Sequence, residues 1–496
     1  MTEKAREDAL RETPGQAPGE TLGQARGETP GQASREAPGE MPGQAPGEAP
    51  GALEELRDRL GDRLLTGEAV REHASDRSIA EPEGMPAGVV LASGTDDVAA
   101  ALAWANEHRV PVSVRGAGSG LSGGSNAYPG GLTVSLAAMD RVLGIDAANR
   151  LADVEPGVVT AELDRAAREH GLFFAPDPAS THLSTVGGNI ATDAGGLRCI
   201  AHGTTGDAVA ALEVVLADGS VIHTGARTLK NATGLNLTPL FVGSEGTLGV
   251  ITRATVRLEP VPEGVPQTFV ASFDDLEAAG RAVTEIVSAE PRPEALELID
   301  DVCARLIEQF RPSGLPQPDA ALLLGQTVGL TASRDAELLL ETCRRHGAVE
   351  TESQEGTALM EARRVANGAL LAGKYSVHCD VGVPVSRLVE MIGGVRRIAE
   401  ESGRGVSILA HAGDGNLHPA VESEDTPEDR AAAEAVVDRI TELAIELGGV
   451  ISGEHGIGSL KHRELPLQFD AATLAAQHAI KAALDPRGIL TPGRGI

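Results

Sequence analysis

The chain has few aromatic residues and far fewer basic than acidic side chains. Phe, Trp and Tyr make up 2% of the 496 residues, so Val, Leu, Ile and Ala must form the hydrophobic cores. Lys and Arg number 42 against 72 Asp and Glu, which gives a formal net charge of −30. Such a surface repels phosphate backbones and argues against a nucleic-acid partner, although local positive groups could still hold an anionic substrate.

Cysteine is scarce, and long apolar runs are absent. Cys199, Cys303, Cys343 and Cys379 lie far apart and form no CxxC pair, so we expect reduced thiols, not a disulfide framework or zinc knuckle. No run approaches the ~20 apolar residues of a membrane-spanning helix. The N-terminus has no signal-peptide core. The prediction is a cytoplasmic protein without a transmembrane segment, with peripheral docking on a membrane left open.

Residues 1–50 hold a degenerate octapeptide repeat that starts at Glu12 and recurs from Glu20, Glu28 and Glu36. The repeat is rich in Pro, Gly, Gln and Glu and has almost no large apolar residues. Such a segment buries too little surface to offset the entropy of ordering it, which predicts a disordered tail with no assigned role.

Strand and helix patterns alternate after the tail, and a proline cluster at 260–266 marks a boundary between two regions. Residues 51–262 are predicted to form one domain (core about 86–262), residues 263–465 a second, and residues 466–496 a segment that returns to the first. Strands are expected at 89–91, 110–114, 132–136, 151–154, 212–216, 221–224, 247–258, 269–270 and 321–324, and helices at 96–108, 158–170 and 274–289.

The first glycine-rich stretch, 115–124, follows a predicted strand and contains a GxGxxG pattern at Gly118, Gly120 and Gly123. A dinucleotide-binding Rossmann motif needs a helix that opens within this pattern, but a Pro-Gly-Gly turn at 129–131 and a strand pattern follow instead. A loop whose successive backbone N–H groups converge on phosphate oxygens fits better, and a plain surface loop is the alternative.

Two more glycine-rich loops, 184–196 and 243–249, favour a long phosphate-containing cofactor over plain surface loops. The motifs RGAGSGLSGG, APDPAS, TVGGNIATDAGG and VGSEGTLGVIT, in this order, resemble the FAD-binding domain of the vanillyl-alcohol oxidase superfamily. The branch that they resemble most contains D-lactate dehydrogenase, D-2-hydroxyglutarate dehydrogenase and one of the subunits of glycolate oxidase. The resemblance runs from about Pro86 to the C-terminus. It implies an α+β fold, in which a vanillyl-alcohol oxidase (PCMH)-type FAD-binding domain precedes an α+β substrate domain with an antiparallel sheet.

The resemblance also implies which residues hold FAD. The first loop would wrap the pyrophosphate, the second would line the flavin and ribityl chain, and the third would lie near the adenosine half. Ser119 stands where some members attach flavin through a histidine, so we expect non-covalent FAD. Thr491 stands where the family favours Asn, which puts one hydrogen bond to the cofactor in doubt. The implied residues are Arg115, Gly116, Ala117, Gly118, Ser119, Gly120, Leu121, Ser122, Pro176, Thr185, Gly187, Gly188, Asn189, Thr192, Glu245, Gly249, Ile251 and Thr491.

Two histidines, His411 and His418, flank a Gly-Asp-Gly turn signal, and a hairpin there would bring both rings to one side. Glu454 is a third candidate ligand, and two His plus one carboxylate suit Zn²⁺ or a similar divalent metal. From spacing alone, ordinary polar loop residues are an equal alternative. The resemblance implies that these three residues bind the metal, that His455 is the catalytic base and that Asn416 orients the substrate.

The expected reaction is oxidation of a small D-2-hydroxy acid. Metal coordination would ease deprotonation of the hydroxyl by His455, and the Cα hydride would transfer to flavin N5. Arg363 aligns with the family's carboxylate-binding arginine, but a shift of one residue would select Arg364, and both could be solvated helix charges. Lys374 is a weaker candidate.

His378 precedes the Cys379–Pro384 motif where the hydroxyglutarate enzymes carry a lysine, which favours D-lactate, then glycolate, as substrate. The electron acceptor stays open among quinone, cytochrome, electron-transfer flavoprotein and oxygen, and a homodimer is also left open. The alternatives are a glycolate oxidase subunit active only in a heteromeric complex, and a metallohydrolase that uses the His/His/Glu site.

Overall fold

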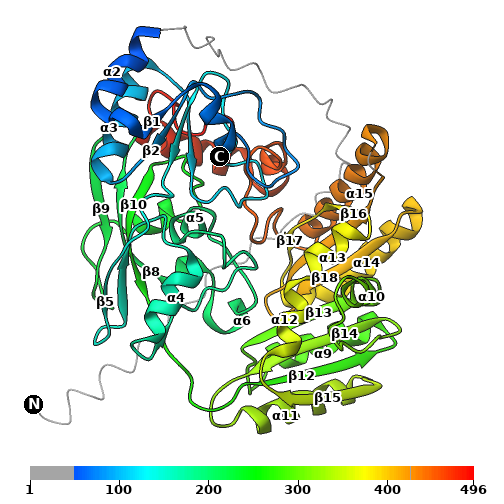
Figure 1. The fold of residues 1–496 in the computed structure, drawn as a ribbon. Coiled ribbons are helices and arrows are strands. Elements are labelled where there is room, and N and C mark those ends of the chain that lie inside the picture. The colour runs from blue at the N-terminus through cyan, green and yellow to red at the C-terminus, as the bar shows by residue number, and fades with distance from the viewer. Residues whose placement is uncertain (1–49, 425) are drawn as a thin grey trace, which may run out of the picture. The chain divides into compact units, whose positions relative to one another are not determined.

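The computed structural model describes residues 50–424 and 426–496 (Figure 1). All of the described residues belong to one compact unit, Glu48–Ile496. The predicted disordered repeat therefore lies outside the described residues, apart from Pro50. All four cysteines are free thiols, as predicted. Within the described ranges, no helix is both long and apolar enough to cross a membrane.

A four-stranded sheet carries the first glycine loop. Its order is β1-β2-β4-β3, with β2 and β3 parallel to β4 and β1 antiparallel to β2. The predicted strand at 110–114 begins two residues late, because Pro111 has no N–H to donate to a ladder. The elements are α2 (Pro50–Leu60), η2 (Gly61–Arg63), β1 (Leu64–Leu65), η3 (Gly67–His73), β2 (Gly88–Leu91), α3 (Thr95–His108), β3 (Val112–Arg115) and β4 (Leu132–Ser135).

A five-stranded antiparallel sheet follows, in the order β5-β6-β10-β8-β9. The predicted hairpin at Asp218-Gly219 is confirmed as the turn between β8 and β9, where Gly219 adopts φ +86°. The elements are β5 (Val142–Asp146), β6 (Leu151–Val154), α4 (Thr160–Arg168), β7 (Leu172–Phe173), α5 (Val186–Thr192), α6 (Cys199–His202), α7 (Thr205–Ala208), β8 (Val209–Val215), β9 (Val221–Gly225), α8 (Thr238–Phe241), β10 (Val250–Arg257) and β11 (Glu259–Pro260), which pairs with β7.

One part of this region differs from the prediction. The second glycine-rich stretch contains the short helix α5, whereas the sequence predicted a loop. Thr185 caps this helix, since its hydroxyl accepts a hydrogen bond from the Gly188 N–H. That cap offsets part of the low helix propensity of Gly187 and Gly188.

The remaining strands form one eight-stranded sheet in the order β15-β12-β14-β13-β18-β19-β16, with β17 paired to β19. Every pairing in it is antiparallel, which confirms the predicted α+β class. Its strands are β12 (Gln267–Phe273), β13 (Ala295–Asp300), β14 (Ala321–Thr327), β15 (Glu350–Glu355), β16 (Tyr375–His378), β17 (Val381–Gly382), β18 (Val406–His411) and β19 (Asn416–Glu422).

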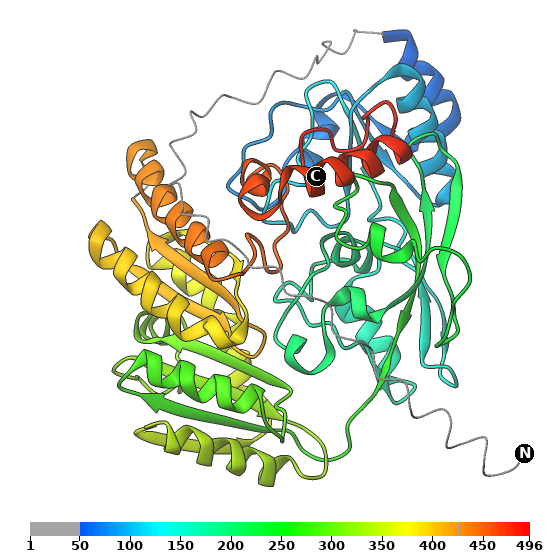
Figure 2. The same ribbon diagram turned by 180° about the vertical axis from the view of Figure 1, so that it is seen from behind.

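Helices cover both faces of this sheet (Figures 1 and 2), so the inner strands β12, β13 and β14 are buried on both sides, whereas the edge strand β15 is mostly exposed. Alternate side chains point to opposite faces. Val270 packs with the core beneath α10, α12 and α13, whereas Ala271 packs with the core beneath α9, α11, α14 and α15. The helices are α9 (Leu276–Val287), α10 (Asp301–Phe310), α11 (Ala332–Arg345), α12 (Ala358–Arg364), α13 (Ala366–Ala372), η4 (Val385–Arg387), α14 (Leu388–Ser402) and α15 (Pro427–Glu446).

The C-terminal residues pair with the first sheet. Leu490 forms a parallel bridge with Val112 in β3, and the Arg494 guanidinium lies 3.9 Å from the centre of the Tyr128 ring. Three short elements precede them: η5 (His462–Glu464), α16 (Leu465–Gln468) and α17 (Ala471–Leu484). The last residues of the chain therefore complete the edge from which the first glycine loop departs.

Candidate active site

The first glycine loop runs from β3 to β4 with no helix between them, as the sequence predicted. A Cβ on Gly116 would lie 2.6 Å from Thr185 Oγ1, so this residue must be glycine for the first loop to approach α5. Gly118 adopts φ +66°, and a Cβ there would lie 2.1 Å from the Arg115 guanidinium. Glycine thus allows both the turn and the close packing.

The three glycine-rich stretches line one cavity of about 400 Å³. Glu454 and His455 line the same cavity, although they follow the first loop by more than three hundred residues. The predicted cofactor residues that line it are Gly116, Ala117, Gly118, Ser119, Gly120, Leu121, Ser122, Thr185, Gly187, Gly188, Asn189, Thr192, Glu245, Gly249 and Ile251.

Three predicted cofactor residues lie elsewhere. The Arg115 guanidinium folds under Gly118 and donates to the Ser75 carbonyl 2.8 Å away, so it supports the loop from behind. Pro176 is buried beside the cavity, which Pro178 lines instead. Thr491 donates its N–H to the Val112 carbonyl, and its buried hydroxyl has no partner.

The predicted hairpin between the two histidines is confirmed. β18 ends at His411, residues 412–415 form the turn, and β19 begins at Asn416. His411 faces Asn416 across the ladder, and His418 lies two residues further along the same face. The strand period of two therefore brings His411, Asn416 and His418 to one side of the sheet.

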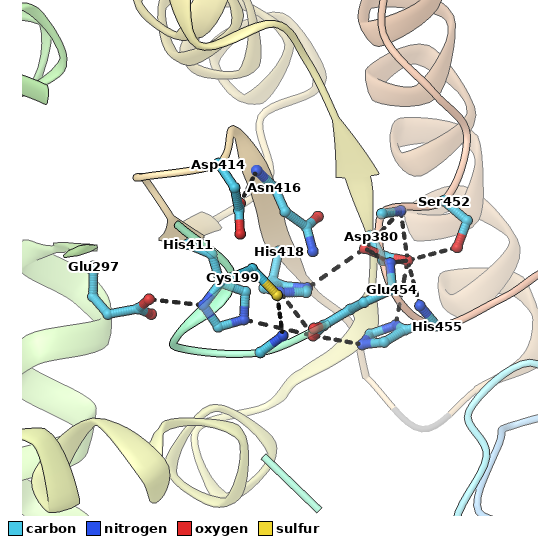
Figure 3. Close-up of polar contacts among 12 residues, drawn as sticks. Cys199, Glu297, Asp380, His411, Asp414, Asn416, His418, Ser452, Glu454 and His455 are labelled. Carbon is cyan, nitrogen blue, oxygen red and sulfur yellow. Dashed lines mark hydrogen bonds and ion pairs between the residues drawn. The ribbon is translucent and has the colours of Figure 1, made fainter. Parts of the chain in front are cut away.

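Glu454 reaches this face from a segment without helix or strand (Figure 3). Its Oε1 lies 3.6 Å from His411 Nε2 and 3.2 Å from His418 Nε2. The three possible ligand atoms all lie within 4.8 Å of one another. In the part of the chain that the structure describes, these side chains have the composition and spacing of a divalent-metal site.

Glu297 orients His411. The two residues are partners in the β13–β18 ladder, and Glu297 Oε1 lies 2.7 Å from His411 Nδ1. A carboxylate at Nδ1 leaves Nε2 free to face Glu454, an arrangement typical of histidines that bind metal. Burial by itself lowers the pKa of His411, but Glu297 and Glu454 outweigh it and raise this pKa well above the usual value.

His455 lies beside the candidate ligands and at the cavity. Its ring stacks on that of His418, with centroids 5.2 Å apart, and its Nε2 lies 3.8 Å from Glu454 Oε1. Burial lowers the pKa of His455 despite the opposing effect of Asp380. A neutral imidazole at the edge of the cavity can accept a proton near neutral pH.

The two adjacent arginines of α12 differ in position. Arg363, the predicted substrate residue, is 4% exposed, donates from Nε to Glu297 Oε2 at 2.7 Å and is absent from the cavity lining. Arg364 lines the cavity and donates from Nη2 to Asp177 Oδ2 at 2.6 Å, while its buried Nη1 has no partner. The structure thus favours the register shifted by one residue. Consecutive helix residues project about 100° apart, so such a shift changes the partner completely.

Sequence reasoning gave no role to Glu297 and Asp380. Glu297 is the one charged residue inside the apolar pattern of 295–299, a signal that could have pointed to it. Asp380 lies within the Cys379–Pro384 motif and is 1% exposed, but no local pattern in the sequence marks it as a site residue.

Family models match most of the described chain. A model of FAD binding domains matches residues 86–225, and a model described as FAD linked oxidases, C-terminal domain, matches residues 265–494. The first match covers the first two glycine-rich stretches, and the second covers the His411–His418 hairpin and Glu454.

Two relatives align with this chain over nearly their whole length. The chain is 40% identical over 420 residues to the glycolate oxidase subunit GlcD of Bacillus subtilis (strain 168), covering 83% of this chain and 89% of that protein. It is 32% identical over 459 residues to the D-lactate dehydrogenase of Anaerostipes hadrus, covering 89% of this chain and 96% of that protein.

The fold is similar to that of a solved enzyme structure. A crystal structure of p-cresol methylhydroxylase with substrate bound superposes with a TM-score of 0.75, covering 90% of this chain and 96% of the other. The sequence identity is 18%, so this likeness concerns the fold alone. It agrees with the predicted PCMH-type FAD-binding fold.

Proposed function

This chain belongs to the family of FAD-linked oxidases that includes glycolate oxidase subunits and D-lactate dehydrogenases, and on that premise we propose that it oxidises a small D-2-hydroxy acid to the 2-oxo acid. One observation carries the proposal: the glycine loops of the FAD-binding region and the Glu454–His455 pair line the same cavity. A flavin held by the loops would have the base at its side. Family membership leaves the metallohydrolase alternative without support.

FAD fits the cavity without a covalent link. Gly116 and Gly118 have no side chain, so backbone N–H groups and small side chains form much of the surface on the loop side. Ser119 lines the cavity at the position where some relatives of the superfamily carry a histidine. A serine offers no imidazole for attachment, which supports non-covalent binding.

A divalent metal, with Zn²⁺ the first candidate, fits His411, His418 and Glu454. The Nε2 atoms of both histidines face one carboxylate oxygen, and the Glu297 carboxylate fixes the His411 tautomer. The Glu454 side chain is 14% exposed, and the charges of His411 and His418 lower its pKa well below the usual value despite desolvation. A carboxylate that stays ionised is ready to coordinate a cation.

The remaining groups have separate tasks. His455 would accept the hydroxyl proton of the substrate, and Arg364 would hold its carboxylate through the unpartnered Nη1. Asn416 Oδ1 is buried without a partner and could accept a hydrogen bond from the substrate. When bound, FAD supplies the hydride acceptor and a divalent metal lowers the pKa of the substrate hydroxyl.

A short monocarboxylate suits this site, with D-lactate first and glycolate second. Burial, together with the neighbouring His455 and His418, lowers the pKa of His378 to about 4. His378 is therefore neutral near pH 7 and cannot act as a cationic clamp for a second carboxylate. Lys374, which follows α13, adopts φ +70° and does not line the cavity, so nothing supports a substrate-binding role for it.

A role as one component of a heteromeric enzyme is the second candidate, because the relative from Bacillus subtilis is named as a glycolate oxidase subunit. The four cysteines are dispersed and offer no iron–sulfur site within this chain. If the isolated chain reduces an artificial acceptor dye with D-lactate or glycolate, it needs no partner for the chemical step.

A substrate panel tests the proposal. The purified chain is assayed with D-lactate, L-lactate, glycolate and D-2-hydroxyglutarate, an acceptor dye, and with or without a chelator. We expect yellow protein that absorbs near ~450 nm, selectivity for D-lactate, and loss of turnover after metal removal that Zn²⁺ restores. Full activity in metal-free protein would remove the role of the metal.

His455→Asn is the matched variant for this panel. It should lower kcat by about 10²–10⁴-fold at unchanged flavin content, because it removes the proton acceptor alone. Wild-type turnover in this variant would exclude His455 as the base.

A further inference from the structure

Residues 452–458 carry the proposed metal ligand and base, Glu454 and His455, yet they form neither helix nor strand. We propose that two carboxylates, the buried Asp380 and the half-buried Glu245, clamp this segment and position both side chains at the cavity. This inference rests on the proposed function, because it assumes the roles given to Glu454 and His455. Asp380 lies in the region of the eight-stranded sheet, whereas Glu245 belongs to the third glycine loop.

Asp380 is the hydrogen-bond acceptor for the first half of the segment (Figure 3). It accepts hydrogen bonds from the Ser452 hydroxyl at 2.7 Å and from the N–H groups of Gly453, Glu454 and His455 at 3.1, 3.2 and 2.9 Å. A carboxylate has about four acceptor positions, so these donors use its capacity. Three consecutive amides aimed at one group fix the backbone and therefore the Cα–Cβ directions of Glu454 and His455.

The Asp380 carboxylate also faces the imidazole rings of His418 and His455. Asp380 lies 4.0 Å from Nδ1 of His418 and 3.9 Å from Nδ1 of His455, so Nε2 of each ring turns toward Glu454. Lys461 closes the arrangement, since its ammonium donates to the Asp380 carbonyl at 2.7 Å and lies 3.5 Å from Oδ2. The cation compensates the buried negative charge.

Glu245 holds the second half. Its two carboxylate oxygens accept the N–H groups of Ile457 and Gly458 at 2.7 and 2.8 Å. The next two amides, Ser459 and Leu460, donate to the Ser122 carbonyl of the first glycine loop at 3.0 and 3.2 Å. The segment is thereby bonded to the loops that line the cavity. Glu245 also lines the cavity, so this role stands beside its predicted contact with FAD.

The glycines of the segment are required by the same contacts. Gly456 adopts φ +81°, and a Cβ on it would lie 3.1 Å from the Glu245 carboxyl carbon. Gly458 adopts φ +50°, and a Cβ on it would lie 2.1 Å from the Ser122 carbonyl oxygen. Positive φ at both residues lets the chain turn from one carboxylate to the other.

The test uses the full-length flavin-loaded chain and the variants Asp380→Asn and Glu245→Gln, each of which replaces one acceptor oxygen by an NH₂ group that faces N–H donors. We expect turnover per bound flavin to fall about tenfold or more, with KM changed far less, because the base is displaced while Arg364 is untouched. Ser452→Ala removes one donor to Asp380 and serves if Asp380→Asn does not fold.

Asp485→Asn is the matched control. Asp485 is also buried, accepts the N–H groups of Ile489 and Leu490 at 3.0 and 2.8 Å, and lies beside Lys481, but it is absent from the cavity lining. This variant should lower stability and keep turnover per bound flavin. Equal losses of turnover per bound flavin in the control and both clamp variants would overturn the proposal. Wild-type turnover in both clamp variants would do the same.

Hydrogen exchange separates the clamp from the proposed function. The amides of residues 453–455 should exchange slowly in the wild type and faster in Asp380→Asn, and those of 457–458 faster in Glu245→Gln. If the wild type oxidises no hydroxy acid yet shows this pattern, the proposed function fails and the clamp stands. Exchange rates that are unchanged in both variants would contradict the clamp, whatever the outcome for the proposed function.

Discussion

Arg363 and Arg364 are neighbours in α12, but their guanidinium groups bind carboxylates in different places. Arg363 pairs with Glu297, which in turn holds His411, so it stabilises the buried charge behind the candidate metal ligands. Arg364 shares Asp177 with Arg198 and keeps one buried Nη1 without a partner at the cavity. The two side chains should therefore affect different kinetic parameters.

Replacing each arginine by methionine tests this division. Arg364→Met should raise KM for D-lactate by about 10–100-fold, since a hydrogen bond to a charged group contributes about 1.5–3 kcal/mol. Arg363→Met should instead lower the bound metal and kcat, because it leaves Glu297 buried without its cation. KM, kcat and metal content per chain are the measurements. The opposite assignment of the two effects would return the carboxylate contact to Arg363.

The glycine loop offers a second residue-scale test, with a control matched in backbone conformation. Gly118 and Gly234 adopt φ +66° and +69°, but only the Cβ on Gly118 would collide with a neighbour, the Arg115 guanidinium. Gly234→Ala should cost about 1 kcal/mol of stability and leave flavin content unchanged. Gly118→Ala should lose most of its flavin, measured by absorbance per chain. Equal flavin content in both variants would contradict the loop geometry.

At the scale of elements, strand register assembles the candidate metal site. The β13–β18 pairing places Glu297 opposite His411, and the β18–β19 pairing places His411 opposite Asn416. Asp300 fixes the end of β13, because its carboxylate caps α10 through the Cys303 N–H and accepts the Ile408 N–H of β18 at 2.6 Å. A shift of one residue in β18 would turn His411 to the opposite face.

Asp300 also predicts a pH dependence of stability. Burial raises its pKa to about 6, from an unfolded value of about 3.9. As pH falls from about 6 to about 4, the folded chain takes up a proton that the unfolded chain does not, so folding becomes more favourable by up to about 3 kcal/mol. Above pH 6 this gain is absent.

The thermal unfolding midpoints of wild type and Asp300→Asn, compared at pH 7 and pH 5, measure the effect. The Asn side chain does not titrate, so the wild type should gain on the variant as pH falls. A difference between the two proteins that does not change with pH would show that Asp300 titrates normally.

Local elements were largely predictable from the sequence, and contacts between distant segments were not. The turn at 412–415 and the strand at 151–154 follow from glycine punctuation and apolar runs that act within a few residues. The cap that makes α5 helical depends on one hydroxyl, which a glycine-rich pattern hides. The Glu297–His411 pairing needs the register of two strands more than a hundred residues apart, and no local pattern encodes it.

At the scale of the whole molecule, the candidate site depends on segments from across the described chain. The first glycine loop, α5, α12, the β18–β19 hairpin and residues 452–458 each contribute side chains to the cavity or to the metal site. Motif order in the sequence predicted most of these contributors. Their convergence on one cavity required the structure, because it depends on buried carboxylates such as Asp380 that bond to other segments.

The bridge between Leu490 and Val112 has a consequence for fragments of this chain. β3 leads into the first glycine loop, and the outer edge of β3 is bridged by Leu490, while the Arg494 side chain stacks on Tyr128. A fragment that stops before Leu490 would therefore leave this edge without its partner, although neither Leu490 nor Arg494 lines the cavity.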